Sequence, residues 1–256
     1  MITSKDNAKI KSIASLVSSA KRRREAGVFV LEGTRLCSEA LAENVEVLEL
    51  YYTKQAECSV VSLINDLKQK ARFESEVSSE VFKKISDTTS PQGVLALVSL
   101  KCKVEAKFSG KWIGFERVAD PSNLGAAART AEALGFDGIL ISNSSACPYS
   151  PKSLRASMGA LLRIPIVVVD DFLGTVSAFK QKGFTVSGTV VQSSALKINE
   201  ISFNENEIVL IGNEANGLTN EAKEICDRLV TIPMLGRAES LNAAVAATIV
   251  MWEMVR

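Results

Sequence analysis

The sequence predicts an α/β protein made of two domains. Short runs rich in Val, Ile and Leu alternate with stretches of helical periodicity, and both halves of the 256 residues show this alternation. In the second half the apolar runs lack polar alternation, which is typical of parallel strands covered by helices on both faces. Between the halves, Lys101 to Lys111 is polar, basic and poor in large apolar residues. We therefore expect one domain at residues 1–104 and a second at residues 105–256.

The first half is expected to begin with an amphipathic helix. Apolar Ile10, Ile13, Leu16 and Val17 recur at helical spacing between residues 6 and 20, and Gly27 is expected near its end. The elements expected after it are strands at 28–31, 45–52 and 94–100 and helices at 34–42 and 60–71. Together they predict a small alternating α/β unit.

The second half is expected to form a larger sheet of short buried strands. The strands are expected at 112–118, 138–141, 164–169, 184–191, 208–211 and 229–232. The intervening helices are expected at 123–134, 172–181, 219–226 and 240–255. This order of elements predicts a parallel sheet with helices on both faces.

Composition excludes several classes of enzyme. The chain has no histidine, which removes the usual general base near neutral pH and the commonest neutral metal ligand. Ser-His-Asp hydrolysis and zinc chemistry of the H-E-x-x-H type are thereby excluded. Chemistry that only positions an already activated substrate stays possible, and methyl transfer from a sulfonium is of this kind.

Cysteine usage and hydropathy bear on the compartment. The five cysteines are odd in number, widely scattered and without a C-x-x-C pair, so buried free thiols and no metal site are expected. No apolar stretch approaches the roughly 20 residues of a membrane span, and residues 1–11 lack the apolar core of a secretory signal. We expect a cytoplasmic protein without membrane contact.

Basic residues are concentrated near the start of the chain. The net charge is only +1, yet residues 1–24 hold seven Lys and Arg against the single acid Asp6. The run Arg22, Arg23 and Arg24 is therefore a candidate for contacts with phosphates. A solvated helix face leading into a basic turn explains the same charges, and charge alone favours that interpretation.

Three stretches at expected strand ends carry the strongest functional signal. They read DPSNLGAAARTAEALG at 120–135, IVLIGNEANGL at 208–218 and IPMLGRAESLNAAV at 232–245. Ligands of open α/β sheets bind beyond the carboxyl ends of the strands. Each stretch also has a plain structural interpretation: a tight turn with a solvated arginine, an Asn-Gly turn, and a helix N-cap at Ser240. The glycine patterns of dinucleotide-binding and P-loop enzymes are absent from the sequence.

Taken together and in this order, the three stretches resemble the signature motifs of the SpoU/TrmH family of RNA 2'-O-ribose methyltransferases, in the SPOUT superfamily. That resemblance covers roughly residues 112–256, and PKSLRASMGALLRIPI between the first two motifs adds to it. The segments KIKSIASLVSSAKRRREAGVFVLEGTRLCSEAL and TTSPQGVLALV are similar to the substrate-binding domain that precedes the catalytic domain in many members. The resemblance therefore spans nearly the whole chain.

The resemblance implies more than the α/β class. It implies a C-terminal Rossmann-like SPOUT domain closed by a deep trefoil knot, and a smaller N-terminal α/β domain of the L7Ae/L30e type that binds substrate. True knots are very rare, so the knot is expected from the family alone. The family also implies a homodimer whose active site lies near the subunit interface, to which the partner subunit's Arg129 contributes.

Site residues follow from the same resemblance, position by position. The reaction centre is expected to hold Asn123, Arg129, Glu214, Ser240 and Asn242. The knot loops would bind S-adenosylmethionine mainly through backbone atoms, at Gly212, Ile232 and Leu241, with Thr189 at the end of the preceding strand as a further candidate. One position departs from the family: the second motif commonly reads N-E-G-x-G, and this chain has Ala215 in place of its first glycine, which is expected to alter the loop beside the cofactor.

The implied reaction moves a methyl group from S-adenosylmethionine to a ribose 2'-hydroxyl of RNA. Arg129 is a poor general base because an arginine guanidinium stays protonated in proteins, so we expect it to anchor the adjacent phosphate and favour the developing alkoxide. Ser240 and Asn242 are expected to orient the hydroxyl, and Glu214 to order its loop. The extra N-terminal domain favours ribosomal RNA as the substrate. Transfer RNA and a non-catalytic ribosome-assembly factor of the same fold stay open as alternatives.

Overall fold

The computed structural model describes residues 1–100 and 107–256. Its contacts divide the chain into two compact units, Met1–Lys103 with Tyr149–Leu162, and Val104–Pro148 with Arg163–Arg256. Both units are mixed α/β, as the sequence predicted. The predicted boundary at residues 104 and 105 falls outside the described residues. Tyr149–Leu162 lies in the range predicted for the second domain, yet it packs with the first unit.

The first unit has a four-stranded sheet in the order β1-β4-β2-β3. Strand β4 runs antiparallel to both β1 and β2, whereas β2 and β3 are parallel. The strands are β1 (Val28–Glu32), β2 (Val47–Tyr52), β3 (Phe73–Glu76) and β4 (Val94–Ser99). The helices are α1 (Ala8–Ser18), α2 (Ala20–Ala26), α3 (Thr34–Ala42), α4 (Lys54–Ser59), α5 (Val61–Lys70), α6 (Ser79–Ile85) and, from the inserted segment, α8 (Pro151–Ser157) followed by the short 3-10 helix η1 (Ala160–Leu162).

The helix predicted near the start of the chain is two helices. Ser19 has an extended backbone (φ −117°, ψ 114°) that ends α1, and its hydroxyl accepts a hydrogen bond from Arg22 N at 3.3 Å, which caps α2. Gly27 ends α2 with φ at 64°, a left-handed conformation that suits glycine. The predicted apolar face is confirmed, because Ile10 and Ile13 are buried in the core of this unit with Tyr51 and Phe82.

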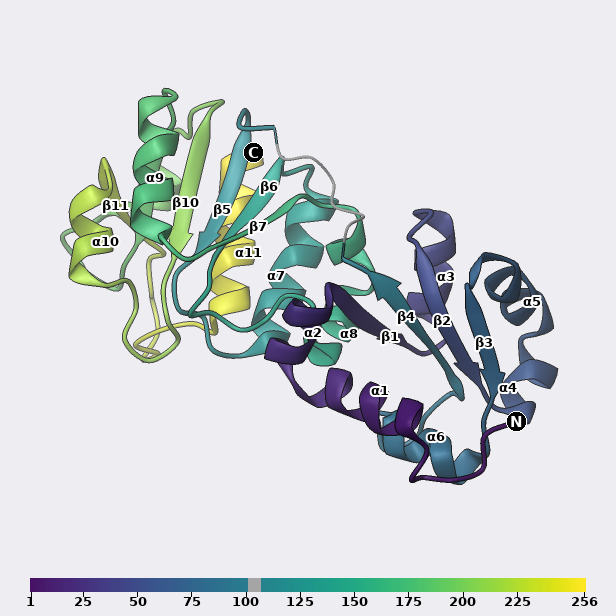
Figure 1. The fold of residues 1–256 in the computed structure, drawn as a ribbon. Helices are drawn as coiled ribbons and strands as arrows, with labels where there is room; N and C mark the ends of the chain where they lie inside the picture. The colour runs from purple at the N-terminus through teal and green to yellow at the C-terminus, as the bar shows by residue number, and fades with distance from the viewer. Residues whose placement is uncertain (101–106) are drawn as a thin grey trace. The chain divides into compact units, whose positions relative to one another are not determined.

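The second unit is built on a seven-stranded sheet in the order β7-β6-β5-β10-β8-β11-β9, and every neighbouring pair of strands is parallel (Figure 1). The strands are β5 (Lys111–Phe115), β6 (Gly138–Ser142), β7 (Ile166–Val169), β8 (Thr185–Thr189), β9 (Leu196–Lys197), β10 (Glu207–Ile211) and β11 (Arg228–Thr231). The helices are α7 (Pro121–Ala133), α9 (Phe172–Gln181), α10 (Asn220–Ile225) and α11 (Ala243–Val255), with the short 3-10 helix η2 (Ile198–Glu200) after β9. The predicted parallel sheet is confirmed.

Helices cover both faces of this sheet (Figure 1). Phe172 and Phe179 of α9 pack with Trp112 and Leu210 of the central strands in one buried cluster. Helix α11 packs against α7 and contacts β5 and β10. Because all strands are parallel, the loops after β5, β8, β10 and β11 leave the same edge of the sheet. In the described part of the chain, no helix is both long and apolar enough to cross a membrane. The sheet order alone does not establish the trefoil knot, which stays a prediction, as does the L7Ae/L30e likeness of the first unit.

Candidate active site

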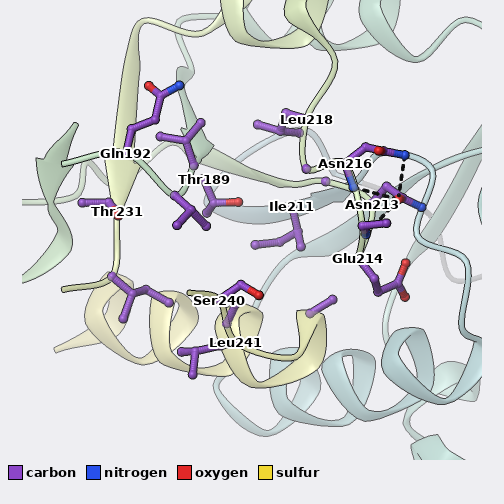
Figure 2. Close-up of a pocket in the computed structure, with 18 of the residues that line it drawn as sticks. Thr189, Gln192, Ile211, Asn213, Glu214, Asn216, Leu218, Thr231, Ser240 and Leu241 are labelled. Atoms are coloured by element: carbon purple, nitrogen blue, oxygen red, sulfur yellow. Dashed lines mark hydrogen bonds between the residues drawn. The ribbon is translucent and has the colours of Figure 1, made fainter. Parts of the chain in front are cut away.

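A cavity of about 420 Å³ lies within the second unit, where the chain leaves β8, β10 and β11 (Figure 2). Apolar side chains of Ile211, Leu218 and Leu241 line its middle, and polar groups lie at its ends. Figure 2 shows Asn213, Glu214 and Asn216 at one end and Thr189, Gln192 and Thr231 at the other. An apolar cavity of this size with a few polar groups is typical of a small-molecule site.

The loop after β10 is folded tightly against itself. Asn213 and Gly217 exchange backbone hydrogen bonds of 3.0 and 2.9 Å, and the Asn213 side-chain oxygen accepts a bond from Ala215 N at 3.0 Å. Gly212 has no room for a side chain, because a Cβ there would lie 2.1 Å from the carbonyl carbon of Gly217 and 2.2 Å from Leu218 N. Gly217 itself has φ at 66°. The two glycines of the motif are therefore needed for the shape of this loop.

Glu214 lies at the centre of a hydrogen-bond network that joins all three motifs. Its carboxylate accepts bonds from Ala119 N at 2.9 Å, Asp120 N at 3.1 Å and Asn123 Nδ2 at 2.9 Å. The other amide end of Asn123, Oδ1, accepts a bond from Asn242 Nδ2 at 2.9 Å. Residues predicted from three separate stretches of sequence thus contact one another.

These bonds change the acidity of Glu214. Partial burial by itself raises the pKa of the carboxyl, but the bonds from Ala119 N, Asn123 and Asp120 N outweigh burial and hold the pKa below its usual value of 4.5. The side chain is therefore ionised near neutral pH and serves as an acceptor. Its observed contacts are with the protein itself, which fits a role in fixing the loop.

Asn242, not Ser240, caps the last helix. Asn242 Oδ1 accepts bonds from Ala244 N at 2.9 Å and Val245 N at 3.3 Å, and α11 begins at Ala243. The interpretation of Ser240 as an N-cap is therefore wrong, because the helix starts later than predicted. Ser240 is exposed, lines the cavity and makes no side-chain hydrogen bond in the described part of the chain.

The four residues predicted to bind cofactor all line the one cavity: Thr189, Gly212, Ile232 and Leu241. The Thr189 hydroxyl donates to the Leu210 carbonyl at 2.8 Å, which joins the ends of β8 and β10. Among the other lining residues that the sequence missed are Gln192 and Lys223. Both lie outside the three motifs, on segments that only the folded sheet brings to this edge.

Arg129 is not among the residues that line this cavity. It is exposed on α7, and across residues 1–100 and 107–256 its guanidinium has no hydrogen bond or ion pair. Its neighbour Thr130 lies 3.1 Å from Thr248 of α11, hydroxyl to hydroxyl. Within one chain the structure therefore joins Asn123, Glu214 and Asn242 by hydrogen bonds and places Glu214 and Ser240 in the lining of the cavity, whereas Arg129 belongs to neither set.

The three basic residues predicted to meet RNA do not share one environment. Arg22 is exposed, as is Arg24, which has an interaction elsewhere in the chain. Arg23 is only 3% exposed, and its Nη1 donates to the carbonyls of Leu16 at 2.7 Å and Val17 at 2.9 Å. These carbonyls are left unpaired at the end of α1. The prediction of an RNA contact is therefore wrong for Arg23, whose charge is used to cap a helix.

The predicted cysteine environments are confirmed in part. Cys37 is buried, and desolvation raises the pKa of its thiol to about 12. Cys147 and Cys226 are half-buried, whereas Cys58 is exposed, which corrects the prediction at that position. Cys102 lies outside the described residues. Among the residues that the structure describes, no group of three His, Cys, Asp or Glu is arranged to hold a metal ion.

Comparison with known proteins agrees with this arrangement. The family model of the SpoU rRNA Methylase family matches residues 111–252, and that of the MRM3-like substrate binding domain matches residues 7–96. A 23S rRNA (uridine(2479)-2'-O)-methyltransferase of Streptomyces viridochromogenes is 32% identical over 268 aligned residues, covering 100% of this chain and 91% of the relative. The 23S rRNA (guanosine(2553)-2'-O)-methyltransferase RlmP of Bacillus subtilis is 30% identical, covering 99% of this chain and 98% of the relative.

Solved structures give the same result. The SpoU methyltransferase AviRb from Streptomyces viridochromogenes, crystallised in complex with the cofactor AdoMet, superposes with a TM-score of 0.85 at 29% identity. That similarity covers 97% of each chain, so it includes both units. The family match, the relatives that align over nearly the whole chain and the cavity lined by the second and third motifs lead to one conclusion: the chain belongs to the SpoU rRNA methylase family.

Proposed function

We propose that the protein transfers a methyl group from S-adenosylmethionine to a ribose 2'-hydroxyl of ribosomal RNA. The observation that carries this proposal is the convergence of Thr189, Gly212, Ile232 and Leu241 on one cavity, beside the hydrogen-bonded group formed by Glu214, Asn123 and Asn242. Relatives that align over 99 to 100% of the chain carry names of 23S rRNA 2'-O-methyltransferases. Their names favour ribosomal over transfer RNA.

The cavity fits S-adenosylmethionine in size and chemistry. Its volume of about 420 Å³ is within the range of small-molecule sites, and Ile211, Leu218 and Leu241 offer apolar surface to an adenine ring. The loops after β8, β10 and β11 expose backbone groups to the same space, among them those of Gly212 and Ile232. When bound, the cofactor supplies a methyl group that its sulfonium has already activated, so the protein needs neither a metal nor a histidine for that step.

The chain's own residues then have to hold the ribose and assist the loss of its proton. Ser240 lines the cavity with a hydroxyl that has no partner among the described residues, so it is suited to orient the ribose. The Oδ1 of Asn242 accepts a hydrogen bond from the start of α11, and its Nδ2 donates one to Asn123. Both ends of the side chain are thus occupied, so Asn242 acts as a positioning residue, together with Asn123 and Glu214. Arg129, always charged, anchors the adjacent phosphate and stabilises the developing alkoxide.

A homodimer completes the site in this proposal. Helix α11 exposes an apolar stripe of Val245 (47% exposed), Trp252 (57%) and Val255 (37%), spaced for one helix face. Arg129 lies on α7 next to Thr130, which contacts Thr248 on this same helix. A second copy packed on the stripe would cover it and would bring the partner subunit's Arg129 towards the cavity. The trefoil knot implied by the family belongs to the same proposal.

The first unit is proposed to bind the RNA. The match to an MRM3-like substrate binding domain over residues 7–96 supports this role. Of the three arginines predicted to meet RNA, Arg22 is exposed and its guanidinium has no partner among the described residues, so it is available for phosphate contacts. We propose that the enzyme acts in the cytoplasm. The competing function is a ribosome-assembly factor that binds RNA without turnover. The intact hydrogen bonds among Asn123, Glu214 and Asn242 favour an enzyme.

The test is methyl transfer itself. Purified protein is incubated with tritiated S-adenosylmethionine and total RNA from a strain that lacks its gene, and any label is mapped by nuclease digestion and mass spectrometry. Label on one ribose of ribosomal RNA is the expected result, whereas label on transfer RNA would identify transfer RNA as the substrate. Cofactor binding with no transfer to free RNA or to ribosomal subunits from that strain would favour the assembly factor.

A further inference from the structure

A second cavity of about 460 Å³ adjoins the proposed cofactor cavity inside the second unit. The two share one wall, made by the loop after β10 and the start of the next helix: Asn213, Asn216, Gly217, Leu218 and Lys223 line both. The remaining lining of the second cavity comes from Arg117, Ala119, Ser144, Thr219 and Asn220.

The lining of this second cavity is cationic. Among the described residues that line it, Arg117 and Lys223 are the charged ones, and none is Asp or Glu. Neither cation has a side-chain hydrogen bond or ion pair in the parts of the chain that the structure describes. Asn216, Asn220 and Ser144 add side-chain amides and a hydroxyl that can donate hydrogen bonds. A lining of this kind suits an anion.

The backbone at Arg117 is held in an unfavourable conformation. Its φ of 58° is left-handed, a region that a residue with a side chain rarely adopts. The Arg117 N–H donates to Ser142 Oγ at 3.0 Å, and its carbonyl accepts from Asn213 Nδ2 at 2.8 Å, so both ends are fixed. Glycine would suit this turn better. The arginine side chain is therefore present at a structural cost, which points to a use for it.

We propose that this second cavity is a phosphate subsite for the RNA substrate, in which Arg117 and Lys223 bind a phosphodiester that flanks the methylated ribose. This inference rests on the proposed methyltransferase function. The 2'-hydroxyl of ribose lies on the carbon next to the one that carries the 3'-phosphodiester. An RNA that presents its 2'-hydroxyl to the cofactor cavity therefore brings a phosphate close by, and the second cavity adjoins that site across one loop.

Another source of negative charge is the carboxylate of S-adenosylmethionine. Lys223 lines both cavities, whereas Arg117 lines only the second. A loss of cofactor affinity on removal of Arg117 would thus indicate that the cofactor tail occupies this cavity. A loss of RNA affinity with normal cofactor affinity would indicate the phosphate of RNA. The two sources give opposite results in the same variant.

Arg117→Gly is the decisive variant because it removes the cation and also relieves the left-handed backbone. It is expected to fold at least as stably as the unchanged protein, as a thermal unfolding curve would show. Lys223→Gln removes the second cation and keeps a long polar side chain. Lys197→Gln is the matched control, since Lys197 is exposed on the edge strand β9 and pairs with Glu200 away from both cavities.

For each protein, affinity for S-adenosylmethionine is measured by calorimetry and affinity for a 23S rRNA transcript is measured over a range of KCl concentrations. We expect Arg117→Gly and Lys223→Gln each to weaken RNA binding by about tenfold and to lower the salt slope by about 0.7 to 1, the loss of one phosphate contact. The cofactor affinity of Arg117→Gly is expected to be unchanged, because Arg117 does not line the cofactor cavity, and Lys197→Gln is expected to keep both affinities.

Unchanged RNA affinity and salt slope in Arg117→Gly would overturn the subsite, as would a selective loss of cofactor affinity. Methyl transfer by the unchanged protein, measured beside these variants, separates this outcome from failure of the proposed function. If the unchanged protein methylates RNA and Arg117→Gly binds RNA equally well, only the subsite is wrong. If the unchanged protein transfers no methyl group to any RNA, the function on which the subsite rests is wrong.

Discussion

The two units use their sheets in different ways. In the second unit all strands are parallel, so the loops after β8, β10 and β11 leave one edge and bring distant motifs around a cavity. In the first unit β4 runs antiparallel to β1 and β2, so its carboxyl end lies at the opposite edge from those of β1, β2 and β3. Strand direction alone therefore favours a composite ligand site in the second unit.

The two units also differ in whether their polar side chains have partners within the protein. In the first unit the buried carboxylate of Glu32 accepts bonds from Asp87 N at 2.8 Å and Thr88 Oγ1 at 2.7 Å, and the guanidinium of Arg23 caps α1. These groups stabilise their own loops and helices. In the second unit Ser240 and Arg129 are left without partners among the described residues. The Ser240 hydroxyl and the Arg129 guanidinium are therefore available to bind a substrate.

The largest effect is expected from Gly212→Ala, which tests whether the cavity depends on close backbone approach. The new Cβ would meet the backbone of Gly217 and Leu218 at 2.1 and 2.2 Å, which no side-chain movement can relieve. We expect loss of detectable S-adenosylmethionine binding by calorimetry. Gly236→Ala, in the loop after β11 with open space around it, is the control. Normal cofactor binding by Gly212→Ala would contradict the proposed site.

The next effect is expected from Arg129→Ala, which tests whether the free cation belongs to the chemistry. Removing a charge that stabilises the developing alkoxide should lower kcat by about 10²- to 10³-fold, while cofactor affinity stays the same. Arg129→Lys should recover only part of the rate, because lysine cannot bind phosphate bidentately. Single-turnover kinetics at saturating RNA measures this directly. A change confined to RNA affinity would assign Arg129 to binding alone.

Asn123→Ala tests the contrast between positioning and reacting groups. Asn123 is 7% exposed and joins Glu214 to Asn242, so its loss should cost about 1 to 3 kcal/mol of unfolding free energy. Asn123→Asp should be worse near neutral pH, because it turns a donor into a second carboxylate against Glu214, and it should recover in acid. Chemical denaturation at two pH values measures both variants. Equal stability of Ala and Asp at all pH values would show that a carboxylate at this position does not repel Glu214, and unchanged stability of both variants would show that Glu214 does not depend on this donor.

Much of the second unit could be predicted from the sequence because its signals are local. The predicted and observed bounds of α9 are the same, and the buried strands β6 and β10 were predicted to within one residue, since apolar runs and helical spacing define them. The three motifs were predicted from their residues, and the structure brings Asn123, Glu214 and Asn242 into contact. What local patterns cannot contain is the packing that adds Lys223 to the cavity and makes Asn242 the helix cap.

The first unit was predicted less completely for physical reasons. Strand β3 (Phe73–Glu76) was missed because FESE is short and mostly polar, and it pairs only with β2 at the edge of the sheet. The break at Ser19 was missed because the helical spacing of apolar residues continues up to Ala20. Arg23 lies between two other arginines, so the sequence gives no sign that its environment differs from theirs. Only the position of the α1 carbonyls decides that Arg23 is buried and Arg22 is not.

A paired substitution tests this difference between adjacent arginines. Arg23→Ala removes bonds to the carbonyls of Leu16 and Val17, so the free energy of unfolding should fall by about 2 kcal/mol, with an indirect effect on RNA binding at most. Arg22→Ala should leave stability within about 0.5 kcal/mol and weaken RNA binding with a smaller salt slope. Denaturation and filter binding on both variants separate the two roles. The reverse pattern would return Arg23 to the RNA surface.

The smallest effect is expected from the titration of Glu214. Its pKa in the folded protein lies below the usual 4.5, so the stability that it contributes is present above pH 4.5 and is lost as the pH falls through the lower folded value. Glu214→Gln cannot ionise and should unfold at a lower temperature than the unchanged protein near pH 7, with the difference shrinking below pH 4.5. Thermal unfolding from pH 7 to pH 3 measures it. A difference that is constant with pH would mean that the shape of the side chain, and not its charge, orders the loop after β10.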